Sequence, residues 1–226
     1  MKDILYRKIF KALNEDLNMT LSDDDFEEPE IDLGVHMQNI QKNINQNILK
    51  LKIQTIIQNT ALSDIINNEW DRETYLYTAT NNDLRDIIEL SIESMGPNAN
   101  LNWIDTSQVT NMTELFDGVE FNGDISGWDV SNVWTMKAMF INSKFNGDIS
   151  GWNVSNVQDM SHMFAGCVFN GDISGWDVSN VQNMKEMFSS SKFNGDISGW
   201  NISKDTNTTY IFYQCHIKEE YKPKFK

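Results

Sequence analysis

The stretch Phe121-Asn-Gly-Asp-Ile-Ser-Gly-Trp128 decides the fold, because the chain repeats it three more times, at 145–152, 169–176 and 193–200. Each copy begins 24 residues after the one before it. A fixed period of this length is typical of proteins in which every repeat forms one structural unit and the units stack. The sequence therefore predicts a stack of like units in its second half.

A second phrase, V-x-x-M-x-x-M-F at 133–140, links the copies. Its apolar residues stand at offsets of 0, 3, 6 and 7, which would place them on one face of a short helix. The Asn-Gly pair at 122–123 and Gly127 instead favour turns around a short strand. We therefore expect each unit to contain a turn, a strand and a helix, and stacked units to bury their apolar side chains as ladders.

Together the phrases resemble the repeat of the BspA-type leucine-rich-repeat family over about residues 103–217. The resemblance implies an α/β repeat solenoid, a short, right-handed leucine-rich-repeat-like stack of four to five units of 24 residues, here with an α-helical N-terminal region. Family members are mostly bacterial or protist surface proteins thought to mediate adhesion, and related repeats occur in mobile and phage-like genes. The resemblance thus implies interaction rather than catalysis.

Four parts are expected along the chain. They are a helical attachment or oligomerisation region with an acidic linker (1–60), a helical N-terminal cap (61–100), the solenoid (101–217) and a frayed basic C-terminal tail (218–226). The cap is expected because an uncapped first repeat would expose an apolar layer. Its strongest signal is a helix from Asp83 to Ser94 that Asn82 caps and Gly96-Pro97 ends, after a strand at 74–79 and a short helix at 62–70.

The first region carries two apolar stripes at helical spacing, which we expect to be interfaces. Their residues are Tyr6, Phe10 and Leu13 in a helix at 4–17, and Met37, Ile40, Ile44, Ile48 and Leu51 in a helix at 36–59. Each stripe can pack on its own domain or on a partner, and the second admits a parallel bundle such as a trimer. Between them runs an acidic segment that is a solvated linker unless a basic partner meets it: Asp23, Asp24, Asp25, Glu27, Glu28, Glu30 and Asp32.

The charge balance narrows the classes of partner. The chain has a formal net charge of −15, from 18 basic and 33 acidic residues. It offers no basic field for nucleic acid or an anionic membrane, so we expect protein partners. No secretory signal and no apolar run of membrane-spanning length is visible. We therefore expect a virion component, with the cell surface as the alternative location.

Stacking turns each repeat position into a column, and two columns invite a functional interpretation. The first holds the acidic residues Asp124, Asp148, Asp172 and Asp196. We favour turns in which each carboxylate accepts backbone N–H bonds, and keep cation binding as the weaker alternative. The second holds Trp128, Trp152, Trp176 and Trp200, which we expect in the core rather than on a glycan-stacking surface.

Trp134 breaks a polar column, because the equivalent residues are Thr110, Gln158 and Gln182. If 133–140 is helical, Ala138 and Ile141 lie on the same side. We expect these three residues to form an interface, and Trp134 to be covered by the N-terminal helices or by a partner.

Cys167 and Cys215 are two repeats apart, so their Cα atoms should be ~10 Å apart at ~4.8 Å per unit, too far for a disulfide. No arrangement of catalytic side chains, metal ligands or cofactor-binding loops is apparent. We therefore expect no enzyme and no cofactor. The expected function is that of a structural component, of the type of a head or tail fibre of a phage or virion. A BspA-like cell-surface adhesin is the first alternative and a glycan-binding module the second.

Overall fold

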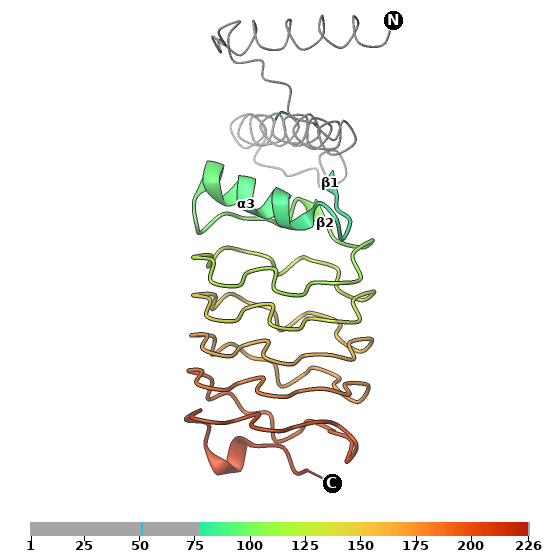
Figure 1. Cartoon of the computed structure of the whole chain (residues 1–226), viewed down its shortest axis with the longest axis vertical. Coiled ribbons are helices and arrows are strands. Elements are labelled where there is room, and N and C mark those ends of the chain that lie inside the picture. Colours follow the sequence, from blue (N-terminus) through green and yellow to red (C-terminus); the bar gives the residue numbers. More distant parts are fainter. Residues whose placement is uncertain (1–50, 52–76, 226) are drawn as a thin grey trace, which may run out of the picture. The chain divides into compact units, whose positions relative to one another are not determined.

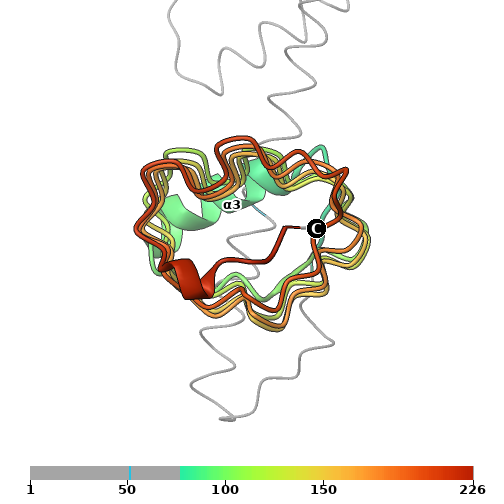
Figure 2. The same cartoon turned by 90° about the horizontal axis from the view of Figure 1, so that it is seen from below.

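The computed structural model describes residue 51 and residues 77–225. All of them belong to one of the two compact units of the chain, Gln46–Lys226. In this unit, successive stretches of the chain form coils that lie one on another (Figure 1). Viewed along the stack, the coils follow nearly the same outline (Figure 2). The expected helices at 4–17 and 62–70 lie outside the described residues, as does that at 36–59 apart from Leu51.

Regular secondary structure is sparse in the described part of the chain. Strand β1 (Tyr77–Thr78) pairs in parallel with β2 (Ile104–Asp105), and helix α3 (Leu84–Met95) lies between them in sequence. A short 3-10 helix, η1 (Glu219–Tyr221), follows the last coil. The helix expected at 83–94 is thus confirmed with shifted ends, and the described part of the strand expected at 74–79 is extended at 77–78.

Helix α3 covers the first coil of the stack, as the cap hypothesis requires (Figure 1). Its inner face buries Leu84, Ile87, Ile88 and Ser91. The helix starts after Asp83, one residue later than predicted, and the Asp83 carboxylate accepts a 2.7 Å bond from the Thr80 N–H in the turn before it. It ends at Gly96, whose φ of 87° is a conformation that glycine adopts without steric cost.

The prediction of a helix inside each unit is wrong. Segment 136–142 forms a series of tight turns, since the N–H of Met139 bonds to the Met136 carbonyl and that of Ile141 to the Ala138 carbonyl. Ala138 and Asn142 have φ values of 52° and 54°, which interrupt a right-handed helix. An apolar period of three to four residues fits both structures, because residues three apart also face the same side in such a turn series.

The backbone groups that these turns leave free join neighbouring coils. The N–H groups of Met136, Ala138 and Phe140 donate to carbonyls exactly one coil further along, at 2.8–2.9 Å. Equivalent bonds recur between the other coils, and single parallel bridges join 111, 135, 159, 183 and 207. The stack is therefore held by coil-to-coil hydrogen bonds at the 24-residue period.

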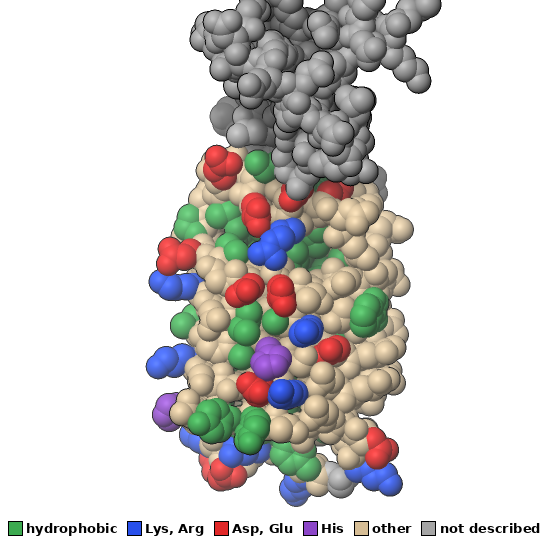
Figure 3. All heavy atoms as spheres, viewed as in Figure 1, with side chains coloured by type: hydrophobic (Ala, Val, Ile, Leu, Met, Phe, Trp, Pro, Cys, Tyr) green, Lys and Arg blue, Asp and Glu red, His purple; other side chains and the backbone are tan. Residues whose placement is uncertain are grey.

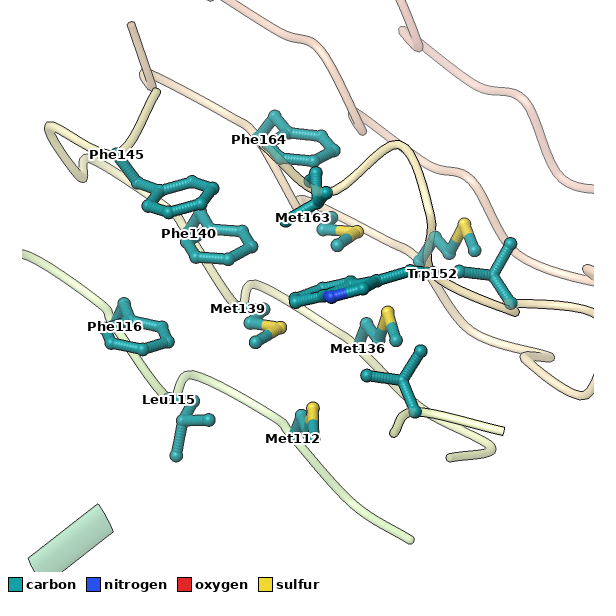
Figure 4. Packing of buried hydrophobic residues seen from close by; sticks show 14 of the residues in the cluster. Met112, Leu115, Phe116, Met136, Met139, Phe140, Phe145, Trp152, Met163 and Phe164 are labelled. Carbon is teal, nitrogen blue, oxygen red and sulfur yellow. The ribbon is translucent and has the colours of Figure 1, made fainter. Parts of the chain in front are cut away.

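The core consists of stacked side-chain columns. Rings of Phe121 and Phe145 lie 6.1 Å apart and those of Phe116 and Phe140 5.3 Å apart, nearly parallel in both pairs. The methionines of successive coils lie beside these rings (Figure 4). Each tryptophan of the Trp column is 4 % exposed. Its indole N–H donates to a carbonyl of the preceding coil, as that of Trp152 does to the Ile125 carbonyl at 3.2 Å. The core interpretation of the Trp column is confirmed.

The basic C-terminal segment is not a frayed tail. Ile217 is buried, the Tyr221 carbonyl accepts a 3.0 Å bond from the Ile197 N–H, and Pro223 is buried. The segment folds back across the opening of the last coil (Figure 2). Its apolar residues explain the difference, because they continue the core where the repeat phrase is lost.

Candidate functional site

The outer positions of the coils are the candidate site, because the inner positions are used by the core. On the face seen in Figure 3, charged side chains of both signs are scattered over the coils, and hydrophobic ones gather towards the lower end. Two outer positions vary strongly from coil to coil. One is the position of Trp134, and the other is occupied by Glu114, Ala138, His162, Glu186 and Tyr210.

Trp134 stands on a rigid backbone but its side chain is 50 % exposed. Its N–H donates to the Thr110 carbonyl at 3.0 Å, and its carbonyl accepts from the Gln158 N–H at 2.8 Å. The N-terminal helices that were expected as one possible cover for this ring lie outside the described residues. A large, half-exposed indole at a position otherwise held by Thr and Gln is a candidate contact point for another molecule.

Ala138 and Ile141 do not share a helix face with Trp134, because no helix forms there. Ala138 is 5 % exposed and Ile141 is half-buried. The geometric reason for grouping the three residues is therefore lost, and an interface at this segment stays a prediction. Of the N-terminal interface residues, Leu51 is helical and 64 % exposed, and the others lie outside the described residues.

The second variable position has an unusual backbone. All five of its residues have φ between 52° and 58°, the left-handed region. Their side chains differ in charge and size, and His162 Nδ1 lies 3.7 Å from Glu186 Oε2, with Lys185 Nζ 3.6 Å from the other carboxylate oxygen. The backbone at this position is therefore constant while the side chain changes from coil to coil.

The acidic column forms the predicted turns. Asp148 Oδ1 accepts a 2.9 Å bond from the Ser150 N–H and a 2.7 Å bond from the Ser150 hydroxyl. These bonds hold the pKa of Asp148 below its ordinary value of 3.8, although the neighbouring carboxylates of Asp124 and Asp172 raise it. Asp124, Asp172 and Asp196 accept the same backbone bond. The carboxylates are therefore satisfied by the chain.

The cation alternative receives no support from the arrangement. Over residues 77–225, no three His, Cys, Asp or Glu side chains come together as metal ligands would. Each acidic residue of the column stands alone in its own turn, whereas calcium requires six to eight oxygen ligands. None of the helices in this part of the chain has the length and apolarity of a membrane span.

Both cysteines are free, as predicted. Cys167 is buried, and burial raises the pKa of its thiol to about 11. A thiol with such a pKa is a poor nucleophile at neutral pH. Cys167 therefore belongs to the core.

An aromatic group at the C-terminal end was missed by the sequence analysis. Tyr210, Tyr213 and Phe225 are 64 %, 54 % and 50 % exposed, and the two tyrosine rings meet edge to face at 5.8 Å. The available signal was that Tyr210 and Tyr213 replace Glu186 and Ser189 of the coil before. Large aromatic residues at variable outer positions mark a contact surface.

Comparison with known families gives one match. The profile of a family described as Mycoplasma protein of unknown function, DUF285, matches residues 87–168 and, in a second overlapping copy, residues 145–222. No curated protein and no solved structure gives a match. The two matches together cover residues 87–222, from within α3 to the last coil.

Proposed function

Because the chain belongs to the family described as Mycoplasma protein of unknown function, DUF285, and that match lies on the coils, we propose that the stack is the functional part and that it binds another protein without catalysing a reaction. We assign the coils to the solenoids of the BspA-type leucine-rich-repeat class. The repeat phrase at 121–140 supports this assignment.

The observation that carries the proposal is the contrast between inner and outer positions. The inner columns repeat the same Phe, Trp, Val and Met residues, whereas the column of Trp134 changes from polar to aromatic and back. Selection for folding alone explains the first pattern but gives no reason to hold an indole 50 % exposed. Contact of the Trp134 ring with a protein partner would give such a reason.

We propose further that the protein is a structural component of a larger assembly, of the phage or virion appendage type, with the virion as its location. The apolar stripe from Met37 to Leu51 would join several copies, and the stack would be presented outward. A BspA-like adhesin on a cell surface is the alternative, and the same stack would serve it. The glycan-binding alternative loses its main support, since the Trp column is buried.

The assembly proposal is tested by the molar mass of the full chain in solution. We expect an oligomer that dissociates when Ile40→Asp and Ile48→Asp are introduced together, because each would place a carboxylate in the apolar stripe. The matched control is Asn43→Asp with Asn47→Asp, which adds the same charge at polar positions of the same segment. A native chain that stays monomeric at all concentrations would contradict the proposal.

The binding role of Trp134 is tested separately. Trp134→Gln installs the residue that the next two coils carry at this position. We expect it to leave the melting temperature unchanged and to abolish retention of the native assembly partner on the immobilised protein. Gln158→Ala is the matched control on the adjacent coil and should retain the partner. Equal retention by all three proteins would overturn the role of the ring.

A further inference from the structure

The two ends of the stack are closed differently. At the first coil, α3 lies over the layer, and Arg85 Nη1 donates to the Glu114 carbonyl at 2.8 Å. Beyond the last full coil, the chain from Ile217 to Tyr221 lies one period after Phe193–Ile197 and covers only that part of the coil. The segment 208–214 of the last coil is therefore left without a coil beyond it.

The uncovered segment presents a row of backbone donors. In every earlier coil the four equivalent N–H groups donate to the coil that follows, as those of Met184, Glu186, Phe188 and Ser190 do at 2.7–3.0 Å. In the last coil these groups are the N–H groups of Thr208, Tyr210, Phe212 and Gln214. Among residues 77–225 none of the four has a hydrogen-bond partner, and all four residues are partly or fully exposed.

This row, which we call the amide edge (208, 210, 212 and 214), differs from the edge of a β-sheet. A sheet edge alternates N–H and C=O groups, whereas here the carbonyls of the turn segment point the other way, towards the preceding coil. An ordinary β-strand would meet the amide edge with half of its groups mismatched. The complementary ligand is one that offers acceptors alone.

The charge of this end favours an anionic ligand. Residues 200–225 carry four lysines against three acidic residues, whereas residues 77–199 carry five basic against sixteen acidic residues. The four N–H dipoles add partial positive charge at the same place. Tyr210 and Tyr213, which belong to the same segment, supply exposed aromatic surface there. The end is thus suited to an acidic peptide with a few apolar side chains.

We propose that the amide edge binds the acidic segment 23–32 of a second copy of this chain, so that copies join head to tail. This segment is Asp-Asp-Asp-Phe-Glu-Glu-Pro-Glu-Ile-Asp, without a basic residue. Its carboxylates recur at alternate positions, first at 23, 25 and 27 and then at 28, 30 and 32, which puts three on one side of an extended chain. The donors of the amide edge also recur at alternate residues.

Carboxylates as acceptors make this pairing stronger than a neutral one. Hydrogen bonds from N–H groups to ionised acceptors are about twice as strong as neutral ones. Pro29 is harmless, since the segment uses its side chains and needs no N–H of its own. The chain enters the stack at the α3 end, opposite to the amide edge (Figure 1), and the response of the contact to dilution distinguishes a second copy from the same copy.

The inference rests on the proposed role in an assembly, and names the partner for one end of the stack. Its test is amide hydrogen exchange of the full chain by NMR, compared with a variant in which all acidic residues from 23 to 32 are replaced by Asn or Gln. We expect the four amides of the edge to exchange at least ~10-fold more slowly in the native chain, because exchange slows when an amide is hydrogen-bonded. The amides of 184, 186, 188 and 190 should be unchanged.

Two controls make the result specific. Replacing Asp117 and Glu93 by Asn and Gln removes acidic charge elsewhere and should leave the protection intact. Diluting the native chain should remove the protection, since the contact joins two copies. Equal exchange in the native chain and the neutralised variant would overturn the proposal, and so would protection that does not change on dilution.

The outcome is separable from that of the assembly proposal. The Ile40→Asp/Ile48→Asp variant tests association through the apolar stripe and leaves the acidic segment intact. If this variant abolishes the oligomer while the four amides of the edge exchange rapidly in the native chain, the assembly proposal stands and the head-to-tail contact fails. If the stripe variant leaves the oligomer intact while the amide edge exchanges slowly in the native chain, the head-to-tail contact stands and association through the apolar stripe fails.

Discussion

Two tryptophans of this chain show how one residue type takes two roles. Trp152 is 4 % exposed and donates its indole N–H to the Ile125 carbonyl, whereas Trp134 is 50 % exposed. We expect Trp152→Phe to lower the free energy of unfolding by ~1–3 kcal/mol, because it removes a buried hydrogen bond and leaves space where the larger indole packed, although the Ile125 carbonyl keeps its bond from the Trp128 N–H. Trp134→Phe should change it by less than ~0.5 kcal/mol. Urea unfolding of the two variants measures both values, and equal losses would contradict the assignment.

The aspartates of the repeat predict how stability depends on pH. The pKa of Asp148 is lowered in the fold, with the Ser150 N–H as the main cause. The folded state therefore binds this proton less readily than the unfolded chain does, so the stabilisation is complete above the unfolded pKa near 3.8 and is lost as pH falls through the folded pKa. We expect the melting temperature to fall steeply on acidification below about pH 4.

A substitution at the same position isolates this effect. Asn153 forms the same kind of turn, with its Oδ1 accepting from the Ser155 N–H at 3.2 Å. Asp148→Asn should therefore keep most of the stability at neutral pH and make the acid-induced loss smaller, whereas Asp148→Ala should be destabilised at every pH. Melting curves from pH 2 to 7 give the comparison. An unchanged acid profile in Asp148→Asn would rule out this carboxylate as a contributor.

At the scale of the element, the turn segment holds non-glycine residues in a left-handed conformation. Ala138 has a φ of 52° and is buried, and this conformation costs roughly 1–2 kcal/mol for a residue with a Cβ atom. We expect Ala138→Gly to raise the free energy of unfolding by up to ~1 kcal/mol, because glycine adopts this φ freely. The measurement is chemical denaturation.

Ala165 is the matched control for this prediction. It is also buried, at 8 % exposed, but it is not among the residues with positive φ. Ala165→Gly should therefore be destabilising by ~0.5–1 kcal/mol, through the flexibility that glycine adds to the unfolded chain. If both variants were destabilised equally, the backbone at 138 would not carry the strain that its φ indicates.

At the scale of the whole molecule, the stack predicts that coils are interchangeable. Deleting residues 145–168 removes one period and joins Lys144 to Phe169, whose predecessor is normally Val168. Every column then stays in register, so we expect a folded protein that melts cooperatively at a lower temperature, since one layer of neighbour contacts is lost. Tryptophan fluorescence follows the unfolding.

Deleting half a period is the informative contrast. Removal of residues 145–156 would place the turn phrase of one coil beside the Trp phrase of the next and break the ladder of bonds from 136–142. We expect this variant to be unfolded. A folded half-period variant would show that the 24-residue register is not what holds the stack.

The sequence by itself determined the period, the inner columns and the turn role of the aspartates. The period places like residues beside one another in neighbouring coils, and an aspartate accepts the N–H of a serine two residues away without any distant partner. Only the tertiary structure decided that 136–142 forms turns rather than a helix. An apolar spacing of three to four residues fits both, and the choice depends on whether the N–H groups bond within the segment or to the next coil. The exposure of Trp134 and the unpaired amides at 208–214 were likewise invisible in the sequence, because each depends on which coil lies beside it and which does not.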